Sequence, residues 1–322
     1  MTTIGSSDLD VSRLCLGGNV FGWTIDEDAS FEVLDAYVAA GGNFIDTADS
    51  YFWRKPGNSG GESETIIGNW MAARGNRDDV VIATKVSSLP SKPGLSAANI
   101  AEAAEDCLRR LRTDYLDLWY VHTVDDTVPF EETLGALDHA VTSGRVRYAG
   151  VSNYCGWRIG RAATWQQAGP GRAPIVANQV RYSLVDRGIE REVVPACTEL
   201  GVGIFPWSPL GGGVLTGKYR GGIPSDSRAA TGHRPDLVAG DSAAGVVEAV
   251  ATAAEGLATS PVAVALAWLR DRPGVSAPIL GARTLGQLTG ALASETLELP
   301  REILAALDDV SAPPVGYPED VH

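Results

Sequence analysis

Three segments of this chain that read as buried strands each end on a side chain able to carry a charge or a proton. The first segment ends on Asp46, and Tyr51 follows five residues later. The second segment ends on Lys85 and the third on His122. In a barrel of parallel strands, the C-terminal ends of all the strands meet on one face. We therefore expect these four side chains to form one proton-transfer site.

Such a set of side chains suits the reduction of a carbonyl group. A ketone or aldehyde that accepts a hydride develops an alkoxide, which needs a proton donor. Tyr51 is the donor in this interpretation, and the ammonium group of Lys85 is expected to lower the pKa of its phenol from about 10. Asp46 would hold Lys85 in place, and His122 would orient and polarise the carbonyl oxygen. Each residue alone is more often structural, so the hypothesis depends on their occurrence together at consecutive strand ends.

The elements that would position these residues follow from the alternation of short apolar segments with amphipathic ones. Strands are expected at residues 14–18, 43–48, 80–85, 115–122, 146–152, 175–180, 203–208 and 276–281. Helices are expected at residues 29–40, 63–73, 97–111, 130–143, 156–166, 190–200, 243–256 and 284–293. Ser63 is expected to cap one helix, and Ser260-Pro261 to open an extra one. Residues 2–11 read as a hairpin.

Eight alternating strand and helix units predict an α/β fold with a parallel sheet. The segment after the first strand, 17–22, does not match Gly-x-Gly-x-x-Gly, which favours closure into a (β/α)8 TIM barrel over an open dinucleotide-binding sheet. No linker divides the chain, so residues 1–322 are expected to form a single domain. Segment 211–241 is its longest rim loop, and loops of such length are usually functional.

The composition excludes several classes of partner. The formal net charge of −14 argues against nucleic acid, whose binders need a basic surface. No apolar run approaches the roughly 18 residues that cross a bilayer, and the N-terminus lacks the features of a signal peptide. The four cysteines and four histidines form no metal-ligand pattern. A cytoplasmic protein with reduced thiols and no metal is expected.

A family resemblance becomes visible when these motifs are taken in order. The chain resembles the aldo-keto reductase superfamily through 46–51 (Asp-Thr-Ala-Asp-Ser-Tyr), the lysine of 83–85, His122, 150–154, 178–179, 207–210, 215–219 and 278–283. The similarity covers nearly the whole chain. It implies a (β/α)8 barrel that binds NADP(H) at its C-terminal rim and reduces a small carbonyl substrate, with Asp46, Tyr51, Lys85 and His122 as the catalytic tetrad.

The same resemblance implies which residues bind the cofactor. They would be Gly18, Asn19, Ser152, Asn153, Gln179, Trp207, Ser208, Leu210, Gly212, Lys218, Gly281, Arg283 and Gln287. Within this set, Ser152, Asn153 and Gln179 would bond the nicotinamide carboxamide, and Trp207 would stack on the ring. Arg283 would meet the adenosine 2′-phosphate, which favours NADP over NAD.

The chain departs from the family pattern at two places. Where the family has a Glu-Asn pair that contacts adenine, this chain has Gly290 and Ala291, so adenine is expected to be held less firmly. The segment 52–61 is longer than the Gly-rich turn common in the family. The aromatic residues expected to wall the substrate pocket are Trp23, Phe52, Trp53 and Tyr182.

Two alternatives use the same residues. A lysine Schiff-base aldolase would employ Lys85 as a neutral amine. An NADP-binding regulatory or partner subunit would keep the fold while turning over slowly. The sequence leaves open both the substrate, an aldehyde for detoxification or a ketone of a biosynthetic pathway, and the oligomeric state.

Overall fold

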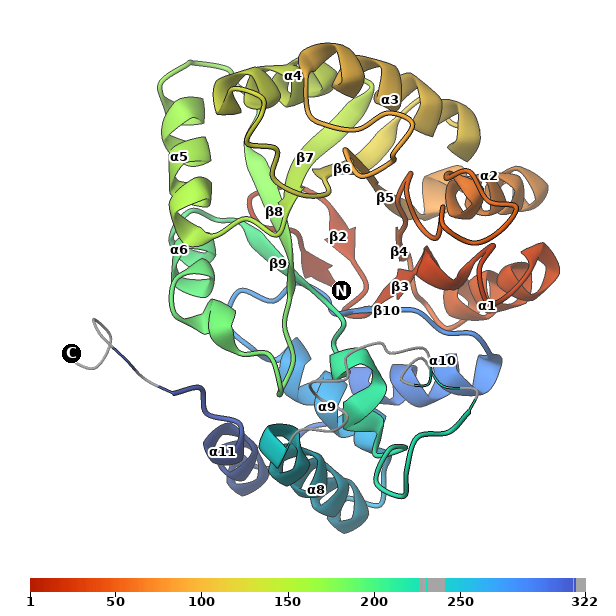
Figure 1. Cartoon of the computed structure of the whole chain (residues 1–322), viewed down its shortest axis with the longest axis vertical. Helices are drawn as coiled ribbons and strands as arrows, with labels where there is room; N and C mark the ends of the chain where they lie inside the picture. The colour runs from red at the N-terminus through yellow and green to blue at the C-terminus, as the bar shows by residue number, and fades with distance from the viewer. Residues whose placement is uncertain (226, 228–229, 231–240, 315, 317–322) are drawn as a thin grey trace.

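The computed structural model describes residues 1–225, 227, 230, 241–314 and 316. Eight parallel strands form one sheet in the order β10-β3-β4-β5-β6-β7-β8-β9. The strands are β3 (Cys15–Gly17), β4 (Phe44–Asp46), β5 (Val81–Val86), β6 (Leu116–Val121), β7 (Val146–Ser152), β8 (Ile175–Arg181), β9 (Gly203–Trp207) and β10 (Ile279–Leu280). A parallel bridge between Ile204 and Val275 joins the two ends of the sheet. The predicted (β/α)8 barrel is confirmed (Figure 1).

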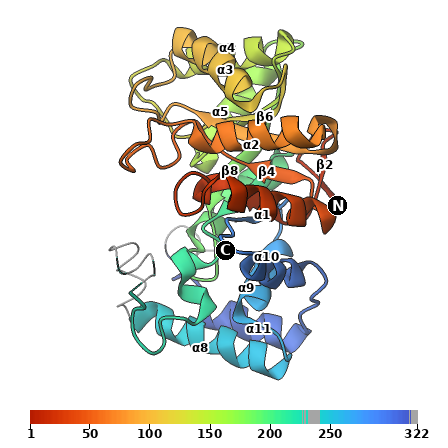
Figure 2. The same ribbon diagram turned by 90° about the vertical axis from the view of Figure 1, so that its right-hand side faces the viewer.

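Helices surround the barrel, as Figure 1 shows. They are α1 (Glu27–Ala39), α2 (Glu62–Arg74), α3 (Ala97–Leu111), α4 (Phe130–Thr142), α5 (Gly156–Gln167), α6 (Val193–Glu199), α8 (Asp241–Gly256), α9 (Pro261–Arg270), α10 (Leu285–Leu292) and α11 (Arg301–Val310). The sequence did not predict α11. Figure 2 shows α11 beside α8 at the edge of the molecule, where Leu307 is buried in a cluster with residues of α8 and α9. Helix α11 follows the last of the repeating strand–helix units from which the helices were predicted, so the repeat gave no indication of it.

One predicted helix cap is confirmed and one is wrong. Ser260 caps α9, because its side chain accepts a hydrogen bond from the backbone N–H of Ala263. Helix α2 instead begins after Gly61, which has a φ of 86°. The Ser63 hydroxyl donates to the carbonyl oxygen of Gly18 at 2.8 Å and thereby ties the start of α2 to the loop after β3.

The predicted N-terminal hairpin closes the end of the barrel where the strands begin. It consists of β1 (Thr2–Thr3) and β2 (Asp10–Val11), which pair antiparallel. Ile4, Leu9 and Val11 are buried in one cluster with residues of the barrel interior. Gly5 has a φ of 46°, and a Cβ there would lie 2.3 Å from the Val176 carbonyl oxygen. This close approach requires glycine at position 5. Because the hairpin covers this end of the barrel, the opposite end is the one open to a ligand.

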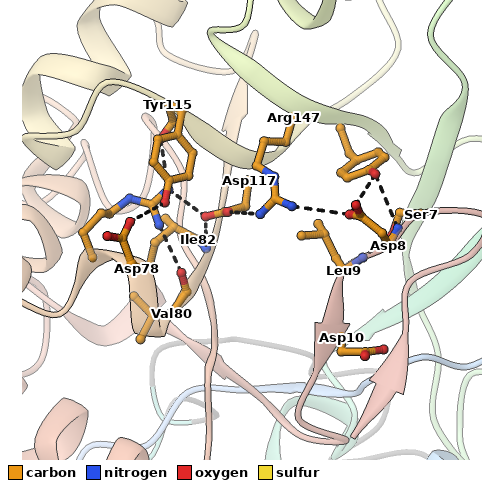
Figure 3. Close-up of polar contacts among 12 residues, drawn as sticks. Ser7, Asp8, Leu9, Asp10, Asp78, Val80, Ile82, Tyr115, Asp117 and Arg147 are labelled. Carbon is orange, nitrogen blue, oxygen red and sulfur yellow. Dashed lines mark hydrogen bonds and ion pairs between the residues drawn. The ribbon is translucent and has the colours of Figure 1, made fainter.

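A polar network joins the hairpin to the strands at this closed end (Figure 3). Asp117, with only 2% of its surface exposed, lies near the start of β6. It accepts hydrogen bonds from Arg77 at 2.7 Å, from Arg147 at 3.2 Å and from the backbone N–H of Ile82 at 3.0 Å. Arg147 also lies 3.3 Å from the carboxylate of Asp8 in the hairpin.

We expect Asp117→Ala to lower the free energy of unfolding by about 3 kcal/mol, because Arg77, Arg147 and the backbone N–H of Ile82 lose the buried carboxylate that they share. Activity should persist, since the network is remote from the open end of the barrel. Denaturant unfolding measures the change, with Asp8→Ala as a control that removes only an exposed partner. Equal losses of unfolding free energy in Asp117→Ala and Asp8→Ala would contradict this stabilising role of Asp117.

No single helix in the described part of the chain is long and apolar enough to cross a membrane. The pair Ala243–Gly256 and Pro261–Arg270 meets that test by length and composition only, with a bend of 103° between its members. Of the predicted rim loop 211–241, residues 226, 228–229 and 231–240 lie outside the described residues.

Candidate active site

Lys85 is the centre of the predicted constellation. It is the fifth residue of β5, and its side chain is fully buried. Its Nζ donates to Asp46 Oδ1 at 2.8 Å and Oδ2 at 2.7 Å, to the Thr47 carbonyl oxygen at 2.7 Å and to Tyr51 Oη at 2.8 Å. Every N–H of this ammonium group is therefore engaged.

The other members converge on the same point because β4, β5 and β6 are neighbours that run in one direction. Asp46 ends β4, and His122 follows directly after β6. Tyr51 lies in the turn after β4 and donates its hydroxyl hydrogen to Asp46 Oδ2 at 2.9 Å. Its ring meets the ring of His122 edge-on, with centroids 6.1 Å apart. The structure thus brings all four residues together.

The expected lowering of the Tyr51 pKa is wrong. Burial and the negative charge of Asp46 raise the pKa of Tyr51 well above 10. The prediction considered the positive charge of Lys85 but left out the effect of the negative charge of Asp46, which neutralises it. Tyr51 is consequently a neutral phenol at ordinary pH and holds its proton until a stronger base is offered.

His122 is neutral as well. Burial and the nearby charge of Lys85 lower the pKa of His122 to about 3. Its Nδ1 lies 3.3 Å from the hydroxyl oxygen of Ser50, and its backbone carbonyl oxygen accepts from Asn153 Nδ2 at 3.1 Å. A neutral imidazole can donate one hydrogen bond but adds no net charge to the site.

A cleft of about 740 Å³ opens above the tetrad at the C-terminal ends of the strands. Tyr51 and His122 line it, whereas Asp46 and Lys85 lie buried beneath. Of the residues predicted to bind cofactor or substrate, the cleft is lined by Asn19, Trp23, Phe52, Ser152, Asn153, Gln179, Trp207, Ser208, Leu210, Gly212, Lys218, Gly281, Arg283 and Gln287.

Comparison with known proteins agrees with this geometry. The model of the Aldo/keto reductase family matches residues 13–312. This chain belongs to the aldo/keto reductase family. It is 38% identical to the "uncharacterized oxidoreductase YrpG" of Bacillus subtilis, over 98% of this chain and 97% of that protein. It is also 33% identical to the aryl-alcohol dehydrogenase [NADP(+)] of Phanerodontia chrysosporium (96% and 85% covered) and 31% identical to the norsolorinic acid reductase of Aspergillus flavus (97% and 81% covered).

Aldo/keto reductases bind a nicotinamide cofactor, and the rim of this cleft has a backbone fitted to close approach. Asn153 and Ser208 have φ values of 62° and 55°, which is left-handed backbone that residues other than glycine adopt uncommonly. The indole N–H of Trp207 donates to Asn153 Oδ1 at 3.1 Å and so fixes the plane of the ring. The backbone N–H of Gly212 donates to Ser208 Oγ at 3.1 Å. These contacts hold the rim in shape without a ligand.

The same rim supplies positive charge to the aldo/keto reductase cleft. Lys218 and Arg283 both line the cleft, and no carboxylate among the described residues forms an ion pair with either. A Cβ on Gly213 would lie 3.2 Å from Lys218 Nζ, so the ammonium group rests against a glycine. Two cations that form no ion pair with a described carboxylate, in a chain of net charge −14, fit the phosphates of a dinucleotide.

Gln179 and Gly18 make contacts that the sequence did not indicate. Gln179 Nε2 donates to Asp46 Oδ1 at 2.7 Å, so its amide is joined to the tetrad as well as to the cleft wall. Gly18 is not among the residues that line the cleft, although Gly17 and Asn19 on either side of it are. A Cβ there would lie 2.8 Å from Ser63 Oγ, so close packing explains the glycine.

Two of the four predicted substrate walls also need correction. Tyr182 lies outside the cleft with 1% exposure, because its hydroxyl bonds Glu190 at 2.6 Å and its ring packs against Trp268. Trp53 is absent from the cleft lining and stacks instead with the guanidinium group of Arg54.

Trp23 and Phe52 do line the cleft, and their rings stack with centroids 3.5 Å apart. The sequence did not reveal what holds them. Lys55 Nζ donates to the carbonyl oxygens of Gly22 and Trp23 at 3.0 and 2.9 Å, and thus ties segment 52–61 to the loop after β3. The unusual length of segment 52–61 was the feature of the sequence that could have indicated this contact.

Proposed function

We propose that this aldo/keto reductase uses NADPH to reduce an aldehyde or ketone to the alcohol. The observation that supports this most strongly is the contact of a neutral phenol with a buried ammonium at 2.8 Å, at the floor of a cleft of about 740 Å³. Bound NADPH would supply the hydride. Ser152, Asn153, Gln179 and Trp207 would hold the nicotinamide, and Lys218 and Arg283 the phosphates.

The residues of the tetrad then divide the proton chemistry. Tyr51 turns its hydroxyl hydrogen from Asp46 Oδ2 to the carbonyl oxygen and gives up the proton as alkoxide character develops. The phenolate that remains faces the N–H of Lys85, which stabilises it at the moment it forms. Asp46 holds Lys85 in place through hydrogen bonds to both of its carboxylate oxygens. His122 donates a second hydrogen bond to the same oxygen.

The burial of Lys85 argues against the Schiff-base alternative. That reaction needs a neutral amine within reach of a substrate carbon. Lys85 is fully buried, does not line the cleft and is bound to both oxygens of Asp46. No feature of the site favours a regulatory subunit over an enzyme.

Steady-state oxidation of NADPH tests the proposal, with a panel that pairs aryl and alkyl aldehydes with the corresponding ketones. Turnover with at least one carbonyl compound is expected. Saturable NADPH binding without turnover across the panel would overturn the proposal in favour of the regulatory subunit.

Arg283→Ala is expected to weaken NADPH binding by about 10- to 100-fold while leaving NADH binding nearly unchanged. The loss corresponds to one or two charge-assisted hydrogen bonds to the 2′-phosphate, which NADH lacks. Dissociation constants from protein fluorescence give both values. Arg220→Ala is the matched control, since Arg220 pairs with Glu248 and lies outside the cleft lining. Equal losses for the two cofactors would show that Arg283 does not meet that phosphate.

A further inference from the structure

Ser50 lines the cleft beside His122 and is not a member of the tetrad. It precedes Tyr51 in the turn after β4 and is 8% exposed. Its hydroxyl oxygen lies 3.3 Å from His122 Nδ1. Among the residues that the structure describes, no other side chain forms a hydrogen bond with either ring nitrogen of His122. With Nδ1 occupied in this way, Nε2 is the nitrogen left to meet a substrate in the cleft.

The position of one proton on that ring decides what His122 can do. A neutral imidazole carries a hydrogen on only one nitrogen, and the other nitrogen presents a lone pair. An oxygen that gains negative charge during reduction needs a donor, so Nε2 must bear the hydrogen. Nδ1 must then accept, and its only partner, Ser50, must donate. The reverse arrangement would point the Nε2 lone pair at the developing alkoxide.

We propose that Ser50 is a positioning residue that fixes His122 as the Nε2–H tautomer. This inference rests on the proposed reductase function.

The tautomer can be measured without turnover. ¹⁵N-histidine labelling, with His122→Gln to assign the signals, reports which ring nitrogen carries hydrogen. We expect Nε2–H at pH 6 in the wild-type protein and a mixture of tautomers in Ser50→Ala. Nδ1–H in the wild-type protein at pH 6 would overturn the proposal.

Kinetics supply the second readout. Ser50→Ala should lower kcat about tenfold, the effect of one oriented hydrogen bond. Ser50→Thr keeps the hydroxyl and should retain kcat near the wild-type value. Unchanged kcat in Ser50→Ala would contradict the proposal. If the wild-type protein reduced no carbonyl compound, the proposed function would fail, while the spectra would still test the tautomer.

Discussion

Replacing Tyr51 with Phe is expected to lower kcat for carbonyl reduction by about 10²- to 10⁴-fold, the usual contribution of a positioned general acid. The ring of Phe fills the same space, so the cleft keeps its shape and the dissociation constant for NADPH should stay within about twofold. A loss in kcat without a loss in cofactor binding is the sign of an interaction that matters only in the transition state. Single-turnover oxidation of NADPH separates the chemical step from product release.

Tyr120→Phe is the matched control for this variant. Tyr120 pairs with Lys85 across the β5–β6 register, is fully buried and does not line the cleft. It should retain kcat near the wild-type value. The proton-donor assignment fails if Tyr51→Phe is as active as Tyr120→Phe. The pH dependence adds a further condition: because the pKa of Tyr51 is raised, reduction should not lose this proton donor below pH 10.

Lys85→Met is expected to abolish activity and also to destabilise the fold by about 3 to 5 kcal/mol. The stability loss arises because the buried carboxylate of Asp46 is left without its counter-charge. A single variant cannot separate the two effects, since an unfolded enzyme is also inactive. The double variant Asp46→Asn/Lys85→Met removes both charges together.

We expect this double variant to regain most of the free energy of unfolding, because no charge remains buried alone. Its kcat should stay at least about 10²-fold below the wild-type value, since no ammonium stabilises the phenolate of Tyr51. Denaturant unfolding and steady-state kinetics on the same preparations measure both quantities. Recovered activity in the double variant would show that Lys85 serves stability alone and would remove it from the mechanism.

The sequence predicted the barrel and the members of the tetrad because both depend on local patterns. Alternation of apolar strands with amphipathic helices requires no knowledge of distant contacts. Since parallel strands share one direction, a residue at a strand end is assigned to the catalytic rim by its position alone. Asp46, Lys85 and His122 were identified in this way, and the family match confirms the resemblance on which the cofactor predictions rest.

The wrong predictions for Tyr182 and Ser63 share one cause: the surroundings of a side chain depend on residues that are distant in the sequence. Tyr182 was predicted to face substrate, but Glu190 and Trp268 hold it in the core. Ser63 has the sequence signature of a cap, yet the left-handed Gly61 starts the helix and frees the serine for the Gly18 carbonyl oxygen. Helix α11 is amphipathic but lies outside the barrel repeat.

The sequence by itself determined which ionisable groups stand at the open end of the barrel and the reaction class that suits them. Only the tertiary structure decided their charge states and partners: the raised pKa of Tyr51, the neutral His122, the bond from Gln179 to Asp46 and the contact of Ser50 with His122. The physical reason is that a pKa depends on burial and on the distances to other charges. Those distances are set when strands remote in the sequence pack side by side.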